Sequence, residues 1–187
     1  NKTRTWGGTT YLVHAPIVGS MSPGTHGVDF GWGGLRTTKQ FVQKFADPSG
    51  ATDKRASFHS SGQNLDINDI SVATDGYGII KYRNVTSTGA TGSNLTWVDT
   101  DYPMFRLAEI YLTYAEAVLR GGAGGDAATA LNYINLLRQR AYGNTSGNIT
   151  AGQLTLQFIL DERARELYWE ATRRTDLIRY GQFTEET

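Results

Sequence analysis

The pattern of apolar and polar positions changes near Tyr102. Before this residue, Gly, Ser, Thr, Asn and Asp interrupt every apolar run, so only short elements fit. After it, apolar residues return at helical spacing. We therefore predict a loop-rich part over residues 1–101 and a helical part over residues 102–187. In the loop-rich part we expect a strand near 11–13, a helix near 38–45, and strands at 78–84 and 95–98.

The first helix after Tyr102 carries apolar residues on two sides. One stripe is Phe105, Ala108, Leu112, Ala115 and Leu119, and the other is Leu107, Ile110, Tyr111, Tyr114 and Val118. A helix of this kind is predicted to lie between neighbours. It should end at Gly121-Gly122, and Asp126 should cap a second helix that runs to Ala141. The short connection predicts an antiparallel helical hairpin.

A third helix is predicted from Leu156 to Ala171, followed by a short fourth helix that Thr175 and Asp176 begin and Gly181 ends. On the polar side of the third helix, Asp161 with Arg165 and Glu170 with Arg174 have the spacing of i,i+4 ion pairs. Paired helices are typical of tetratricopeptide arrays. However, this segment shows no internal repeat near 34 residues.

Composition and charge narrow the class of protein. The 187 residues suit one globular domain or the larger part of one, and 18 Lys and Arg balance 18 Asp and Glu. This balance argues against nucleic acid or an anionic membrane surface as a partner, because both require clustered positive charge. The absence of cysteine excludes disulfides, Cys-based zinc sites and thiol nucleophiles. The 22 glycines with only 19% charged residues indicate long, ordered loops.

The charged residues of the helical part are predicted to be structural. Buried charges without partners cost several kcal/mol, so we expect ion pairs on the facing sides of the helices. The residues concerned are Glu116, Arg138, Arg140, Glu162, Arg163, Arg173, Asp176 and Arg179. In particular, we predict that Glu116 pairs with Arg138 across the hairpin. The alternative is a glycosidase-like pair of carboxylates, Glu162 and Glu166, one helical turn apart.

Metal sites have little support in the sequence. His14, His26 and His59 lie in the loop-rich part without metal-ligand spacing, and we interpret them as ordinary loop histidines. No Glu-x-x-His motif of a di-iron bundle is present. The loop aspartates Asp47, Asp53, Asp66, Asp69 and Asp75 leave a structural calcium open, with no ligand set assigned. We expect no other cofactor.

Four ordered blocks in the helical part resemble the SusD/RagB family. They cover residues 101–117, 135–141, 159–167 and 176–181. Upstream, residues 31–38 with Phe41 and Phe45, and residues 53–55, resemble the starch-binding members of that family. One departure is Ala171, where the family usually has Gly before the last block; we expect it to alter local packing rather than role.

This resemblance implies a mainly α fold, in which a tetratricopeptide-like helical scaffold carries a large loop-rich, partly β, ligand-presenting segment. It also implies a function that is not enzymatic: a lipid-anchored glycan-binding protein on the outer membrane surface passes oligosaccharides to a SusC-like TonB-dependent transporter. Family members are longer, and their lipid anchor is an N-terminal cysteine. The resemblance therefore implies that the chain corresponds to a C-terminal fragment of one SusD-like domain.

Three aromatic residues of the loop-rich part are candidates for glycan binding. Sugars present an apolar C–H face ringed by hydroxyls, so a site needs exposed flat side chains flanked by polar groups. Trp32 lies between glycines, and Tyr11 and Trp6 belong to the same part of the chain. An arc of Tyr11 and Trp32 would follow a curved, starch-like glucan, as in starch-binding relatives. The alternative is that these aromatics only pin loops onto the core.

The predicted hydrogen-bonding residues of this site are Arg36, Asp29 and Asn64. The other large aromatics of the second half are interpreted as core: Trp97, Tyr102, Tyr111, Tyr114, Tyr168 and Trp169. Two other classes of function stay open. A glycoside hydrolase would need opposed carboxylates beside the aromatics, whereas a protein-interaction scaffold would bind a peptide in a helical groove.

Overall fold

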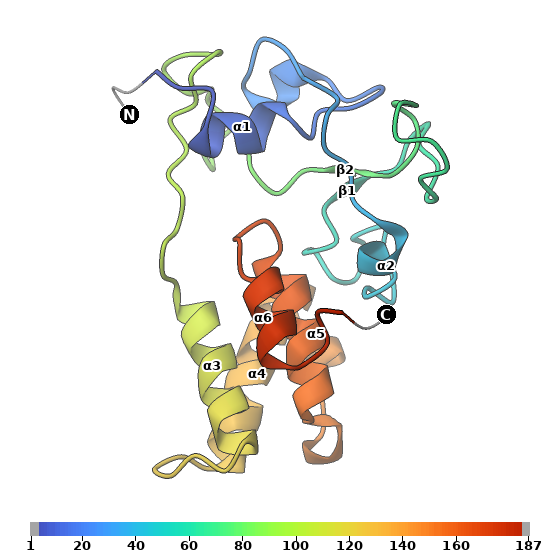
Figure 1. The fold of residues 1–187 in the computed structure, drawn as a ribbon. Helices are drawn as coiled ribbons and strands as arrows, with labels where there is room; N and C mark the ends of the chain where they lie inside the picture. The colour runs from blue at the N-terminus through green and yellow to red at the C-terminus, as the bar shows by residue number, and fades with distance from the viewer. Residues whose placement is uncertain (1–3, 185–187) are drawn as a thin grey trace. The chain divides into compact units, whose positions relative to one another are not determined.

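A computed structural model describes residues 4–184, which form two compact units (Figure 1). The loop unit comprises the chain up to Gln43 together with Ser57–Tyr102, and the helical unit comprises Lys44–Ala56 together with the chain from Pro103 on. The division expected from the sequence, at residues 101/102, thus differs from the observed one mainly in the segment Lys44–Ala56. Residues 44–56 join the helices because ion pairs tie them there, as described below.

The loop unit contains few regular elements. They are α1 (Gly8–His14), a 3-10 helix (Pro23–His26), α2 (Lys39–Val42) and two short strands, β1 (Phe58–His59) and β2 (Gly78–Ile79). The strands pair antiparallel, with Phe58 opposite Ile79. The helix expected near 38–45 is present in shorter form, and the strand expected at 78–84 is reduced to two residues.

Two strand predictions in the loop unit are wrong. The strand expected near 11–13 lies in α1, where the N–H of Ala15 donates to the carbonyl of Tyr11 at 3.0 Å. The strand expected at 95–98 is a turn, because the side chain of Asn94 accepts from the N–H groups of Thr96 and Trp97, each at 2.9 Å. Local hydrogen bonds of this kind compete with strand pairing.

A small apolar core holds the loop unit together. It consists of Val13, Ile17, Val18, Met21, Val28 and Val98. Buried side-chain amides supplement it: the amide of Asn84 donates to the carbonyls of Gly27 and Asn94, both at 2.9 Å. Because buried backbone carbonyls must find donors, such bonds allow long loops to pack without a sheet.

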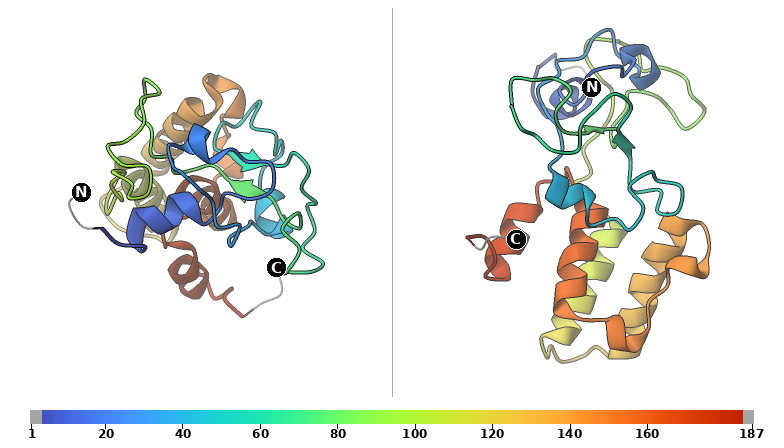
Figure 2. Two further views of the ribbon diagram at one scale, coloured as in Figure 1. Left: turned by 90° about the horizontal axis from the view of Figure 1, so that it is seen from above. Right: turned by 90° about the vertical axis from the view of Figure 1, so that its right-hand side faces the viewer.

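The helical unit contains α3 (Leu107–Leu119), α4 (Ala127–Tyr142), α5 (Leu156–Leu167) and α6 (Arg173–Arg179), with short 3-10 helices at Thr145–Gly147 and Ala151–Gln153. Figure 2 shows α3, α4 and α5 alongside one another. Their core includes the fully buried Leu112, Ile134 and Ile159. Asp126 caps α4 as predicted, accepting from the N–H of Thr129 at 2.8 Å.

The residues of the two predicted apolar stripes of α3 are buried to different degrees in the described structure. Ala108, Leu112 and Ala115 face the core. In contrast, Leu107 is 62% exposed and Ile110 is 55% exposed, and Phe105 precedes the helix with 83% of its surface exposed. Tyr111, Tyr114 and Val118 of the second stripe also pack against the core. Within residues 4–184, α3 thus contacts both α4 and α5, as its sequence predicted, and its most exposed apolar residues lie in its first turn.

The connection between α5 and α6 differs from the prediction. Helix α5 ends at Leu167 rather than near Ala171, and α6 begins at Arg173 rather than at Asp176. Between them, Trp169 and Ala171 have positive φ angles of 61° and 57°. Residues with a Cβ rarely adopt this left-handed conformation, so these two residues interrupt the helical pattern that their sequence suggests.

A buried group of charged residues joins residues 44–56 to the helices. Arg55 donates to Asp53 at 2.7 Å and to Glu162 at 2.8 Å. Glu162 is fully buried and also accepts from Arg138 at 2.8 Å and from Arg165 at 2.6 Å. Three guanidinium groups thus surround one carboxylate, which provides the compensation that a buried charge requires.

The neighbouring carboxylates are paired in the same way. Glu166 accepts from Arg140 at 2.6 Å and from Arg106 at 2.5 Å, and Arg106 also donates to Glu170 at 2.7 Å. The expected pair of Glu170 with Arg174 is replaced by this contact with Arg106. Likewise, the expected pair of Asp161 with Arg165 is not formed, because Lys44 contacts Asp161 at 2.6 Å and Arg165 turns to Glu162.

The predicted pair of Glu116 with Arg138 is also wrong. Glu116 accepts from Arg179 at 2.8 Å and from Arg120 at 2.9 Å, whereas Arg138 faces α5. The remaining residues predicted to form ion pairs have these partners. Asp176 contacts Arg163 at 2.9 Å and Arg179 at 2.8 Å. Arg173 donates instead to the carbonyl of Leu160 at 3.1 Å.

We predict that acid destabilises the helical unit. Burial alone would raise the pKa of Glu166, but hydrogen bonds from Arg106 and Arg140 outweigh it and lower that pKa to about 2. The same balance, with Arg179 and Arg120 as donors, lowers the pKa of Glu116 to about 2. An unfolded glutamate has a pKa near ~4.3, so this stabilisation is complete above that pH and is lost as the pH falls toward 2.

For Glu166, the shift corresponds to roughly 3 kcal/mol of unfolding free energy. Urea unfolding followed by circular dichroism at pH 6 and pH 3 measures the part of this free energy that is lost by pH 3, roughly half. Glu166→Gln should be less stable at pH 6 and should lose less stability on acidification than the parent chain. Equal unfolding free energies of the parent chain at the two pH values would contradict the prediction.

We further predict that Ala171→Gly stabilises the chain by up to about 1 kcal/mol. The left-handed conformation costs a residue with a Cβ ~1–2 kcal/mol, and the greater backbone entropy of unfolded glycine offsets part of the gain. The matched control is Ala117→Gly at an exposed position inside α3, which should lose about 1 kcal/mol. Chemical denaturation compares the two, and a loss at both positions would contradict the prediction.

Candidate functional site

Six rings gather in the loop unit and are called the aromatic cluster: Trp6, Tyr11, His14, Phe30, Trp32 and Trp97. Three segments supply them. Tyr11 and His14 come from α1 and Trp6 from the residues before it; Phe30 and Trp32 come from the loop after the first 3-10 helix; Trp97 follows the Asn94 turn. The cluster thus brings together residues that lie up to about 90 positions apart.

The rings are in direct contact and inclined to one another. The centroids of Trp6 and Trp97 lie 4.3 Å apart. Trp32 lies 5.9 Å from Trp6 and 5.6 Å from Tyr11, with ring planes inclined at 62° and 61°. These are the edge-to-face and tilted arrangements that aromatic pairs favour. They produce a surface of inclined rather than coplanar rings.

The cluster has a buried base and an exposed rim. Trp6 is 48% exposed and Tyr11 is 42% exposed, which is unusual for large aromatics. His14 is fully buried and stacks on Trp32 with a centroid distance of 5.5 Å and an interplanar angle of 19°. Trp32 is therefore supported from below, while Trp6 and Tyr11 present apolar area to the solvent.

Asp29 supplies a polar group beside the cluster. Its carboxylate accepts from the hydroxyl of Thr96 at 2.5 Å, and its N–H donates to the carbonyl of Leu95 at 3.2 Å. These contacts place Asp29 next to Phe30 on one loop and next to Trp97 on the other. A carboxylate beside exposed rings is the combination that recognises a sugar by its apolar face and its hydroxyls.

The other two predicted hydrogen-bonding residues organise a separate loop. Arg36 donates to the carbonyls of Ile70 and Val72, at 2.6 and 3.1 Å. Asn64 donates to the carboxylate of Asp75 at 2.9 Å, and Asp75 also accepts from backbone N–H groups. The contacts of Arg36 and Asn64 therefore shape the loop of residues 63–76, rather than joining Asp29 at the aromatic cluster.

Sequence reasoning missed three members of the cluster. The sequence predicts Trp97 as a core residue and His14 as an ordinary loop residue, and it gives no reason to select Phe30. In the structure Trp97 contacts Trp6, and His14 is a helical residue that is fully buried. The Asn-x-Thr-Trp order around Trp97, which suits an Asx turn, is the one local signal that could have placed this ring in a loop.

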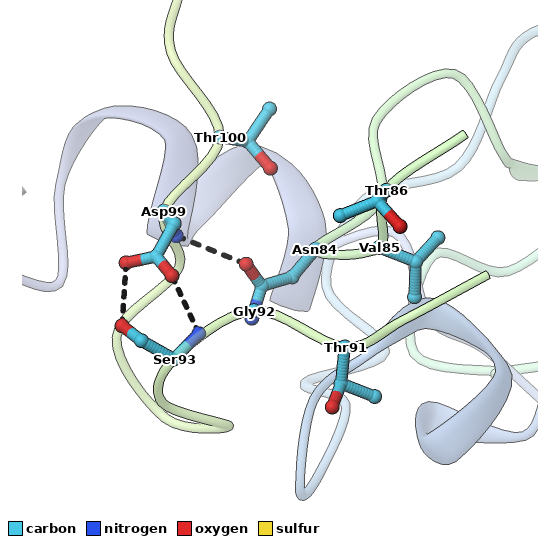
Figure 3. A pocket seen from close by; sticks show the side chains of 8 residues that line it. All are labelled: Asn84, Val85, Thr86, Thr91, Gly92, Ser93, Asp99 and Thr100. Carbon is cyan, nitrogen blue, oxygen red and sulfur yellow. Dashed lines mark hydrogen bonds between the residues drawn. The ribbon is translucent and has the colours of Figure 1, made fainter. Parts of the chain in front are cut away.

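A pocket of about 320 Å³, lined mostly by residues with polar side chains, lies elsewhere in the loop unit (Figure 3). Its wall consists of Asn84, Val85, Thr86, Thr91, Gly92, Ser93, Asp99 and Thr100. Asp99 accepts from the N–H and hydroxyl of Ser93, and its own N–H donates to Asn84. Because these bonds occupy the carboxylate and no aromatic ring lines the pocket, it lacks the features of the aromatic cluster.

The two glutamates considered as a catalytic pair are unsuited to acid–base chemistry. Glu162 and Glu166 are both buried and surrounded by arginines. Despite burial, which raises it, the pKa of Glu162 is lowered by the charges of Arg55, Arg165 and Arg138. A general acid of a glycosidase needs a raised pKa and access to substrate. These residues therefore form part of the scaffold.

Across residues 4–184, no group of three or more His, Cys, Asp or Glu side chains is placed to hold a metal ion. Asp47 instead accepts from Ser49 and Thr52, and Asp69 from Ser71, which accounts for two of the aspartates considered as calcium ligands. None of the helices in the described residues has the length and apolar character needed to cross a membrane.

Comparison with known proteins gives the family. Residues 52–187 match the family model described as the SusD family. The chain belongs to this family. The starch-binding protein SusD of Bacteroides thetaiotaomicron is 36% identical over 226 aligned positions, which include 98% of this chain and 39% of the relative. The chain thus spans about two fifths of the length of that relative.

Solved structures agree with this membership. Surface glycan-binding protein A from Bacteroides thetaiotaomicron, in complex with laminarihexaose, is 25% identical with a TM-score of 0.64, covering 95% of this chain and 38% of that one. A SusD superfamily protein from Bacteroides vulgatus is 29% identical with a TM-score of 0.56, covering 79% and 29%. The predicted mainly α, SusD-like fold is confirmed, and the functional names of these relatives denote binding rather than a reaction.

We predict that Arg36→Ala loosens the loop of residues 63–76 without unfolding the loop unit. Bonds from a charged donor are worth ~1.5–3 kcal/mol when buried, and Arg36 is only partly buried. Amide hydrogen exchange of residues 68–74 should accelerate roughly tenfold. Lys39→Ala, which removes an exposed ion pair with Asp66, is the matched control and should have little effect. Unchanged exchange in Arg36→Ala would contradict the assignment.

Proposed function

We propose that the chain binds an oligosaccharide at the aromatic cluster and does not act as an enzyme. The observation that carries this proposal is the contact of Trp32 with Tyr11 and Trp6, which joins a supported ring to two exposed ones. Aromatic rings offer large, rigid apolar area at low entropic cost. The family membership and the names of the starch-binding and glycan-binding relatives support the same function.

The inclination of the rings favours a curved glucan. Rings whose planes differ by about 60° can meet successive sugar units only if the chain turns between them. A flat, extended polysaccharide would stack on coplanar rings instead. We therefore infer a starch-like glucan as ligand, with Tyr11, Trp32 and Trp6 as stacking residues.

Asp29 is proposed as the acceptor for sugar hydroxyls beside the rings. One of its carboxylate oxygens accepts from Thr96, and the other has capacity for a ligand hydroxyl. Arg36 and Asn64 remain proposed hydrogen-bonding residues for a ligand that extends from the aromatic cluster to the loop of residues 63–76, through N–H groups that their contacts within that loop do not use. Each hydrogen bond adds little net free energy, because it replaces a bond to water, so stacking should dominate the affinity.

The setting proposed for this binding is the surface of a bacterial outer membrane. There the full-length protein, held by an N-terminal lipid anchor, would deliver the oligosaccharide to a SusC-like TonB-dependent transporter. This proposal rests on the family resemblance and on the name of the surface glycan-binding relative.

We predict that Trp32→Ala weakens binding of maltoheptaose about tenfold or more, because it removes the central stacking ring. Isothermal titration measures the effect, with a β-glucan oligosaccharide and an inulin-type fructan as comparison ligands. Phe105→Ala, which removes an aromatic ring that is 83% exposed in the helical unit, is the matched control and should bind like the parent chain.

The same samples test the enzymatic alternative through assay of reducing ends. Their release from polysaccharide by the parent chain would contradict a purely binding function. Unchanged affinity in a folded Trp32→Ala variant would remove the stacking role, and a preference for the fructan would overturn the starch-like assignment.

A further inference from the structure

His14 makes polar contacts as well as ring contacts within the aromatic cluster. Its Nδ1 lies 2.7 Å from the carbonyl oxygen of Phe30, and its Nε2 lies 3.0 Å from that of Thr96. Its own carbonyl accepts from the N–H of Trp32 at 3.0 Å. One fully buried residue therefore contacts both the loop that carries Phe30 and Trp32 and the segment that carries Trp97.

The imidazole ring also contacts the rings that these loops present. It stacks on Trp32, lies 4.9 Å from Phe30 between centroids, and meets Trp6 edge-on at 6.4 Å. Trp97 follows Thr96 in the sequence, so the contact with the Thr96 carbonyl fixes the backbone next to Trp97. A bulky apolar residue at position 14 could fill the same space but could bond to neither carbonyl.

We propose that His14 is a positioning residue that sets the relative orientation of Trp6, Trp32 and Trp97. It thereby controls glycan affinity without touching the ligand. This inference rests on the proposed function for its effect on binding, but its effect on ring geometry stands independently. The neighbouring backbone supports it: the N–H groups of Gly33 and Gly34 donate to the carbonyls of Ile17 and Ala15, both at 3.0 Å.

Both ring nitrogens of His14 face oxygens that can only accept. A neutral imidazole carries one N–H and so donates to one carbonyl, whereas a ring with a proton on each nitrogen donates to both. Substitutions can separate the two bonds. The amide nitrogen of asparagine reaches about as far as Nδ1, toward Phe30, and that of glutamine about as far as Nε2, toward Thr96.

The experiment compares His14→Ala, His14→Asn and His14→Gln by near-ultraviolet circular dichroism and by titration with maltoheptaose. Near-ultraviolet dichroism reports the mutual orientation of the tryptophans, since Trp6 and Trp97 lie only 4.3 Å apart. His14→Ala should reduce the tryptophan signal and weaken the affinity about tenfold or more. The asparagine and glutamine variants should each restore part of the tryptophan signal and part of the affinity.

His26→Ala is the matched control. His26 is also buried in the loop unit and bonds through Nδ1 to the carbonyl of Ser22 at 2.9 Å, but it contacts none of the aromatic cluster's rings among the described residues. It should lower stability while leaving the tryptophan signal and the affinity of the folded protein nearly unchanged. Far-ultraviolet dichroism confirms folding of each variant.

A folded His14→Ala variant with the parent's tryptophan signal and affinity would overturn the proposal. If that variant does not fold, the asparagine and glutamine variants decide: parent-like spectra and affinity in both would overturn the proposal, because each variant keeps at most one of the two side-chain contacts. If the parent chain binds no glycan, the proposed function fails, and the dichroism comparison alone then supports or overturns the positioning role.

Discussion

The buried contact between Arg55 and Glu162 is the interaction on which the helical unit depends. It joins residues separated by 107 positions and brings Lys44–Ala56 onto α5. A fully buried carboxylate is tolerable only with charged donors around it, and Arg138 and Arg165 complete that requirement. Removing one partner of such a group typically costs ~3–5 kcal/mol, because the remaining charge stays buried without compensation.

The loop unit is organised by a different principle. Its apolar core is small, and its long loops are held by side chains that bond to backbone groups, as Asn84 and Asp75 do. Such loops can be rigid without regular secondary structure, because their backbone groups are satisfied by specific partners. This rigidity allows three distant segments to bring their aromatic rings into one cluster, with Trp6 and Tyr11 exposed at its rim.

The division of labour between the units favours binding over catalysis. The buried carboxylates of Glu162 and Glu166 are surrounded by arginines, so they stabilise packing and are not free to transfer protons. The exposed aromatic area lies instead in the loop unit, where Asp29 is a nearby charged group whose bonds leave acceptor capacity. A scaffold of this kind can retain its helices while its loops change ligand preference, as expected when function resides in a site carried by a fold.

The sequence by itself determined the helices and the family. Apolar spacing and the Asp126 cap predicted α3 and α4 closely, because periodicity and capping are encoded within a few residues. Only the tertiary structure decided which charges pair, that Tyr11 lies in a helix, and that Trp97 joins Trp6. The pair of Glu116 with Arg179 joins residues 63 positions apart, and Trp6 and Trp97 are still further apart in the sequence, so the local pattern does not specify these contacts. At Ala171, packing overrides the conformational preference of the residue, which adopts the left-handed conformation.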